Sequence, residues 1–146
     1  MFRLAIAICA VLTSMPAKAQ LSPVGLWKTV SDSDGRATSE IRISEADGEL
    51  VGKIERNLDP RAKLDDVCVE CKGDRKNQPI TGLEIIRAAK KAAGKDVWEG
   101  GTIVDPDNGA VYKLKMIPVE GGKKLEVRGF LGVSFLGRTQ VWIRVE

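Results

Sequence analysis

Residues 97–117 read VWEGGTIVDPDNGAVYKLKMI, and this stretch decides the fold class. Its second half alternates Tyr112 and Leu114 with Lys113 and Lys115, which is the period-two pattern of a half-buried strand. The Asp-Pro-Asp-Asn-Gly segment before it is typical of a tight turn, so the stretch is predicted to form a β-hairpin. The Gly-Gly pair in the first half favours a bulge or sharp bend, as the corners of barrels need.

The same alternation recurs along most of the chain. Strands are predicted at residues 24–30, 38–44, 50–56, 97–105, 110–117, 124–131 and 138–145. Short turns join most of them, and a long polar connection covers residues 57–82. We therefore predict an all-β fold, an up-and-down antiparallel β-barrel of about eight strands with one long loop, because closure removes exposed strand edges. A two-sheet sandwich is the main alternative, but it usually needs more long connections.

Residues 83–93 are ambiguous. Residues 83–86 have the composition of a strand, whereas residues 87–93 are rich in alanine and lysine, which favour helix. Gly94 is suited to cap such a helix at its C-terminal end. We predict a strand to about Ile86, followed by at most a short helical turn.

The first 19 residues have the pattern of a secretory signal peptide. Arg3 supplies the positive start, residues 4–12 are apolar, and Ala17-Lys18-Ala19 matches a cleavage site. Cleavage is predicted between Ala19 and Gln20, which leaves a single domain of residues 20–146. Because the remaining chain has no apolar stretch of about 18 residues, we expect no transmembrane segment and a periplasmic or secreted protein.

Charge and composition exclude several function classes. Cleavage of the predicted leader would remove Arg3 and Lys18, so that 21 of the 23 basic residues remain beside 20 acidic residues. These charges are interleaved, which is unlike the clustered basic face of a nucleic-acid binder. The sequence has no histidine, the usual general base and commonest metal ligand. We therefore predict no catalytic residue, no metal, no cofactor and no enzymatic activity.

Cys68 and Cys71 form a C-x-x-C pair in the long connection. An exported protein meets an oxidising environment, so a structural disulfide is the favoured interpretation. A thioredoxin-like redox pair is the alternative, although loop composition follows the pair rather than the helix that lowers a thiolate pKa. A zinc site would need further ligands that the mature chain does not supply.

Several motifs stand in order along the mature chain. They are Val24-Gly25-Leu26-Trp27, Cys68-x-x-Cys71-Lys72-Gly73, Gln78-Pro79-Ile80-x-Gly82-Leu83, Trp98-x-Gly100-Gly101-x-Ile103-x-Asp105-Pro106, Asn108-Gly109-x-x-Tyr112, Leu125-x-Val127-Arg128-Gly129 and Gly137-Arg138-Thr139-Gln140-x-Trp142-x-Arg144-Val145. The series resembles the bacterial exported family catalogued as domain of unknown function 2147. This resemblance implies a lipocalin-like (calycin) barrel and no established reaction.

The resemblance also implies how one end of the barrel is closed. Lipocalins carry G-x-W on their first strand, with a basic residue near the last strand packed across the tryptophan. Gly25 and Trp27 match the first part of this pattern. Arg144 is the candidate for the second part, and Arg138 is the alternative.

These features predict a binding module for a small hydrophobic or amphipathic molecule held in the barrel. The candidate wall residues are Ile43, Ile54, Tyr112, Leu114, Met116 and Val127. An envelope protein with a filled barrel is the alternative, and it would meet a protein partner through residues 72–79 and 132–137. A redox protein that uses Cys68 and Cys71 is the third possibility.

Overall fold

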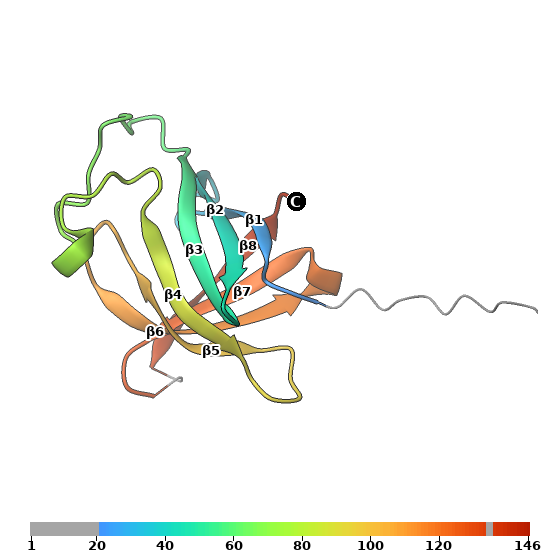
Figure 1. Ribbon diagram of the computed structural model, residues 1–146. Coiled ribbons are helices and arrows are strands. Elements are labelled where there is room, and N and C mark those ends of the chain that lie inside the picture. The colour runs from blue at the N-terminus through green and yellow to red at the C-terminus, as the bar shows by residue number, and fades with distance from the viewer. Residues whose placement is uncertain (1–20, 134–135) are drawn as a thin grey trace, which may run out of the picture.

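The computed structural model describes residues 21–133 and 136–146. The predicted leader and the cleavage site therefore lie outside the described residues. The described part forms a closed antiparallel barrel in which eight strands follow one another in sequence order (Figure 1). The strands are β1 Gly25–Val30, β2 Ala37–Ala46, β3 Glu49–Asn57, β4 Glu84–Lys91, β5 Trp98–Val104, β6 Val111–Val119, β7 Lys124–Phe130 and β8 Gly137–Arg144, with 3-10 turns η1 Gly73–Arg75 and η2 Glu120–Gly122.

The first and last strands close the barrel. Trp27 and Lys28 of β1 pair with Arg144 and Ile143 of β8. Every other strand pairs with its neighbours in sequence, so no Greek-key crossover is present among the described strands. This topology confirms the predicted up-and-down barrel and rejects the sandwich.

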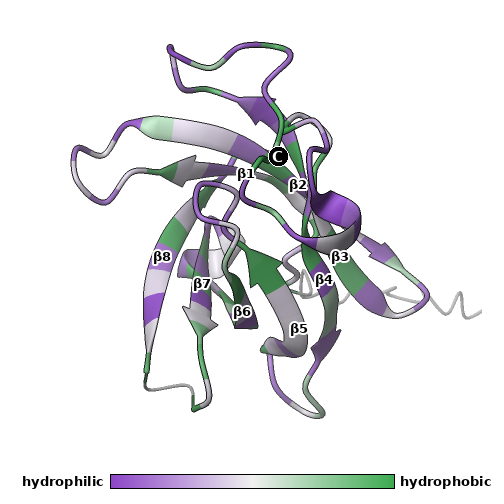
Figure 2. Cartoon of the chain, turned by 90° about the vertical axis from the view of Figure 1, so that its left-hand side faces the viewer, coloured by the Kyte–Doolittle hydropathy of each residue, from purple (hydrophilic) through white to green (hydrophobic). Residues whose placement is uncertain are grey.

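The interior follows the alternation seen in the sequence. On β8, Trp142 points inward and is 2% exposed, whereas Val141 and Ile143 on either side are 41% and 42% exposed. Ile41 and Ile43 of β2 are likewise buried. The hydropathy of the strands shows the same alternation of polar and apolar residues (Figure 2).

The prediction for residues 87–93 was wrong. The segment is not a helical turn, because β4 continues to Lys91 and pairs with both β3 and β5. The helix propensity of alanine and lysine amounts to a fraction of a kcal/mol per residue. Backbone pairing with a strand on each side outweighs that preference, although register shifts interrupt the pairing with β3. Gly94 lies in the turn that joins β4 to β5 rather than at a helix end.

The Gly-Gly pair of β5 lies at the predicted irregularity. The register between β5 and β6 shifts between Glu99 and Thr102. A Cβ atom on Gly101 would overlap the carbonyl oxygen of Arg87, so the neighbouring strand β4 leaves no room for a side chain there. Ala88 of β4 has a φ of 59°, which places a second distortion beside the first. Together they bend the wall at this corner.

Because the strands alternate in direction, the connections alternate between two ends of the barrel. One end, here called the mouth, carries residues 31–36, 58–83, 105–110 and 131–136, of which Ser134 and Phe135 lie outside the described residues. The opposite end, here called the floor, carries the three other turns and the segments next to β1 and β8. Figure 1 shows the longest connection, in green, extending from the mouth.

Candidate functional site

The floor is plugged by Trp27. This side chain is fully buried, and its Nε1 donates a hydrogen bond to the carbonyl oxygen of Pro23 at 2.7 Å. The Arg144 guanidinium lies 4.1 Å from the centre of the indole ring. A cation over an indole face stabilises the fold by roughly 0.5–2 kcal/mol. The structure thus places the predicted pair Trp27 and Arg144 in direct contact, whereas Arg138 lies at the mouth.

Arg144 also ties two backbone segments together, the one before β1 and the η2 turn. Its Nε, Nη1 and Nη2 donate to the carbonyl oxygens of Gly122, Val24 and Ser22 at 2.5, 2.9 and 2.7 Å. Burial lowers the pKa of this guanidinium from its ordinary value. Gly25 leaves room for it, because a Cβ atom there would lie 2.6 Å from Arg144 Nη1, and its φ of 142° is one that other residues rarely adopt. The G-x-W motif is therefore explained by packing at the floor.

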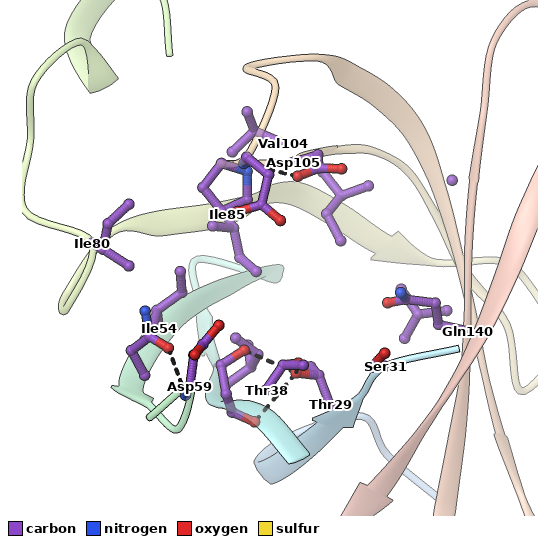
Figure 3. Close-up of a pocket in the computed structure, with 18 of the residues that line it drawn as sticks. Thr29, Ser31, Thr38, Ile54, Asp59, Ile80, Ile85, Val104, Asp105 and Gln140 are labelled. Atoms are coloured by element: carbon purple, nitrogen blue, oxygen red, sulfur yellow. Dashed lines mark hydrogen bonds between the residues drawn. The ribbon is translucent and has the colours of Figure 1, made fainter. Parts of the chain in front are cut away.

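Above the floor the barrel is hollow. A cavity of about 1460 Å³ opens at the mouth and extends down to Trp142. Its deep part is apolar and is lined by Ile41, Ile54, Ile85, Ile103, Val127 and Trp142. Figure 3 shows Ile54 and Ile85 pointing into this space from different strands.

One wall of the cavity is polar. Thr29 Oγ1 lies 2.6 Å from Thr38 Oγ1 and 2.8 Å from Ser39 Oγ, so three hydroxyl groups from β1 and β2 form one hydrogen-bonded cluster (Figure 3). On β8, the Oε1 atom of Gln140 accepts a hydrogen bond from Trp142 Nε1 at 3.2 Å. The cavity therefore combines hydrogen-bonding groups with an apolar base, as small-molecule pockets do.

The mouth is acidic. Seven carboxylates line it, against the three cations Arg61, Lys63 and Arg138. The carboxylates belong to Asp32, Asp59, Asp65, Asp66, Glu70, Asp105 and Asp107. Two of them are paired, since Arg138 binds Asp32 and Arg61 binds Asp59.

The carboxylates influence one another across the mouth. The pKa of Asp107 is raised, first by loss of solvent and then by the negative charges of Asp105 and Asp59. In contrast, the pKa of Asp59 is lowered to about 2 by the hydrogen bonds it accepts from Arg61. Asp59 and Asp105 come from different connections and lie on opposite sides of the cavity (Figure 3).

Part of the long connection forms a strap, here defined as residues 66–80. Val67 bridges to Pro79, and the Cys68 N–H donates to the Gln78 carbonyl at 2.8 Å. Cys68 and Cys71 form a disulfide, and both residues are only 1% exposed. The bond is local and buried, which favours the structural interpretation over a redox pair.

The strap packs against the β5–β6 turn. Cys68 Sγ lies 3.5 Å from the Pro106 carbonyl oxygen. A Cβ atom on Gly109 would overlap the Glu70 carbonyl, so the strap and the turn are in backbone contact. The strap residues Val67 and Val69 line the cavity, which makes the strap part of its rim.

The predicted wall residues divide into two groups. Ile54, Tyr112 and Val127 line the cavity. Ile43, Leu114 and Met116 do not line it and are almost completely buried in the packed core. Alternation alone identifies the inward face of a strand. It does not tell how far along the barrel axis the packing stops.

The acidic mouth was missed in the sequence. Part of the signal was available, because the connections 31–36, 58–83 and 105–110 each contain two or more acidic residues, whereas the floor turns contain one each. An up-and-down barrel gathers these alternate connections at one end. Among the described residues, no group of three or more Cys, Asp or Glu side chains is arranged to hold a metal ion. None of the helices in the described part is long and apolar enough to cross a membrane.

A closed antiparallel barrel with an indole and a guanidinium at its floor and a cavity at its mouth defines a lipocalin-like protein. Residues 25–144 match the family described as "Uncharacterized protein conserved in bacteria (DUF2147)", and the chain belongs to this family.

A comparison with solved structures supports the same fold. The chain is similar to the structure described as "Protein HP1028 from the human pathogen Helicobacter pylori belongs to the lipocalin family". The TM-score is 0.74 at 18% sequence identity, over 86% of this chain and 84% of that chain. No curated protein matches the sequence.

Proposed function

We propose that this protein binds a small hydrophobic or amphipathic molecule in its barrel. The observation that carries the proposal is the open cavity of about 1460 Å³ with an apolar base. Pockets for small molecules are mainly apolar, with a few polar groups that fix orientation. The hydroxyl cluster at Thr29 and Gln140 on β8 are such groups.

The hollow interior favours this function over an interaction module with a filled barrel. Apolar burial supplies roughly 25 cal/mol per Å² of ligand surface removed from water, so an alkyl chain is a suitable occupant of the deep part. Residues 72–79 and 132–137 stay a predicted partner surface, and Leu136 in the second of them is 61% exposed. The leader pattern of residues 1–19 supports the further proposal that the protein acts in the periplasm or outside the cell.

Native mass spectrometry of the purified protein, followed by solvent extraction, tests for a bound molecule. The blocking variant Val127→Trp places an indole in the cavity, and the matched variant Val141→Trp places one on the exposed face of β8. We expect only the first variant to lose binding of the extracted molecule and of alkyl probes. A barrel that stays empty against a broad lipid panel, or equal binding by both variants, contradicts the proposal.

Export is tested separately by fractionating cells that express the full chain and sequencing the N-terminus of the mature protein. We expect periplasmic or secreted protein that begins at Gln20. Uncleaved protein in the cytoplasm contradicts this part of the proposal.

A further inference from the structure

The charge at the mouth differs from the charge of the rest of the chain. The mature sequence carries 21 basic and 20 acidic residues, which is close to balance. The mouth holds seven carboxylates and three cations, so four negative charges there are not compensated by lining residues. The imbalance lies directly above an apolar cavity, where low-dielectric walls concentrate the field of the charges.

Several of these carboxylates have no cationic partner within the described part of the chain. Asp65, Glu70 and Asp107 line the mouth without a hydrogen bond or ion pair to their side-chain oxygens in residues 21–133 and 136–146. Asp105 accepts hydrogen bonds from the Asp107 N–H and from Asn108, which are neutral donors. The raised pKa of Asp107 agrees with this geometry: loss of solvent raises it first, the negative charges of Asp105 and Asp59 add to the rise, and no cation among the described residues opposes them.

We propose that the cavity takes a single-chain amphiphile whose polar head carries a positive charge, such as an alkylammonium. The inference rests on the proposed binding function and adds the chemical class of the ligand. The alkyl chain lies in the deep part between Ile54, Ile85 and Val127. The head stays at the mouth, where its positive charge lies beside Asp107 and Asp105 and remains in contact with solvent.

The alternatives fit less well. An anionic head group, as in a fatty acid or an alkyl sulfate, would enter a mouth with four excess negative charges. Arg61 and Arg138 are poor partners for it because each already pairs with an aspartate. A neutral head group leaves the repulsion among the carboxylates unchanged.

Binding of three dodecyl probes tests the ligand class. The probes are dodecyltrimethylammonium, dodecyl sulfate and a dodecyl chain with a short neutral oligo(ethylene glycol) head, each below its micelle concentration. Binding is followed by calorimetry and by tryptophan fluorescence, to which Trp142 in the cavity lining contributes. We expect the ammonium probe to bind at least about tenfold more tightly than the sulfate probe, with a preference that shrinks as salt is raised.

Charge-neutralising variants test whether the preference for the ammonium probe arises from the carboxylates at the mouth. The triple variant Asp65→Asn, Glu70→Gln, Asp107→Asn removes the unpartnered carboxylates. The matched control Glu45→Gln, Asp47→Asn, Glu99→Gln makes the same change in net charge at residues that do not line the cavity. We expect the first variant to lose about tenfold in ammonium affinity while it keeps its affinity for the neutral probe, which also shows that it is folded. The control is expected to keep the wild-type preference.

The outcomes separate this inference from the proposed function. If none of the three probes binds, the proposed function itself fails. If all bind equally, or the sulfate probe binds best, the barrel is a binding protein and the inference of a cationic ligand is overturned. A preference that micromolar calcium abolishes would also overturn it, because the mouth would then be a metal site.

Discussion

The floor and the mouth of the barrel satisfy their charged groups in opposite ways. At the floor, the single guanidinium of Arg144 donates to three carbonyl oxygens and covers a fully buried indole. At the mouth, the carboxylates outnumber the cations, and the space below them is empty. A satisfied network rigidifies the structure, whereas unpaired charges beside a cavity suit a ligand. Under the proposed function, stability and binding therefore belong to different ends of one barrel.

Loss of the plug should have the largest effect. Trp27→Ala is expected to destabilise the fold by about 3–5 kcal/mol, because it opens a cavity beneath Arg144. Trp142→Ala is the matched change at the cavity, where the indole already lacks neighbours on one side, and it should cost less. Urea unfolding measures both. Equal losses would mean that the two ends do not differ in packing.

Two isoleucines provide the same comparison with smaller side chains. Ile43 lies in the packed core and Ile54 lines the cavity, although both are buried. We expect Ile43→Ala to fall in the upper part of the range of about 2–5 kcal/mol and Ile54→Ala in the lower part. The free energy of unfolding of each variant decides this. A larger loss for Ile54→Ala would contradict the placement of the cavity.

The disulfide between Cys68 and Cys71 is expected to stabilise only the mouth end of the barrel. Its loop is short, so the chain-entropy estimate of its stabilisation is about 2 kcal/mol. The variant Cys68→Ser, Cys71→Ser should lose that amount of unfolding free energy and show faster amide exchange in the strap. Amides near Trp27 should change little beyond the effect of the lower global stability. Reduced wild-type protein is the control. Uniform changes throughout the barrel would contradict a local role for the bond.

Gly109 tests the contact between the strap and the β5–β6 turn. Its φ is 70°, and that of Gly94 in the β4–β5 turn is 68°. Alanine at either position meets the same backbone strain of about 1–2 kcal/mol. Only at position 109 does the new Cβ also overlap the Glu70 carbonyl, whereas nothing lies within 4 Å at position 94. Gly109→Ala should therefore melt at a lower temperature than Gly94→Ala, and equal melting temperatures would argue against the contact.

The smallest effect is expected for Asp107→Asn. The pKa of Asp107 is higher in the folded state, so the folded protein holds this proton more tightly than the unfolded chain does. The carboxyl group is therefore least destabilising below the unfolded pKa of about 3.9, and stability is lost as the pH rises through the folded pKa. The variant should gain roughly 0.5 kcal/mol at neutral pH relative to wild type, and this gain should vanish in acid.

Unfolding measured across this pH range tests the prediction. Asp47→Asn, in a turn at the floor, is the control variant. A gain of equal size at all pH values would contradict an origin in the Asp107 charge.

Much of the barrel could be predicted from local patterns. Alternation at Tyr112, Leu114 and Met116 gave the inward face of β6, and the Gly-Gly pair marked the bend in β5. The prediction for residues 87–93 was wrong because their intrinsic preference is helical, whereas pairing with β3 and β5 keeps the chain in a strand as far as Lys91. Such tertiary override is expected wherever propensity is weak compared with a complete hydrogen-bond ladder.

The candidate site was predictable only in part. Ile54, Tyr112 and Val127 were assigned to the wall from their parity, and they do line the cavity. The Asp-Pro-Asp-Asn-Gly segment was predicted only as a tight turn, and Asp32 lies more than 70 residues away from Asp105 in the chain. Their combined negative charge at one opening arises only when closure of the barrel brings alternate connections to the same end.

The sequence by itself determined the direction in which each strand side chain points, because alternation is a property of the extended backbone. It also determined the G-x-W motif and the local disulfide partners. Only the tertiary structure decided how deep the packed core extends, which end is hollow, and which charges share one opening. Those properties depend on distances between segments remote in sequence, and the closing pair of β1 with β8 sets these distances.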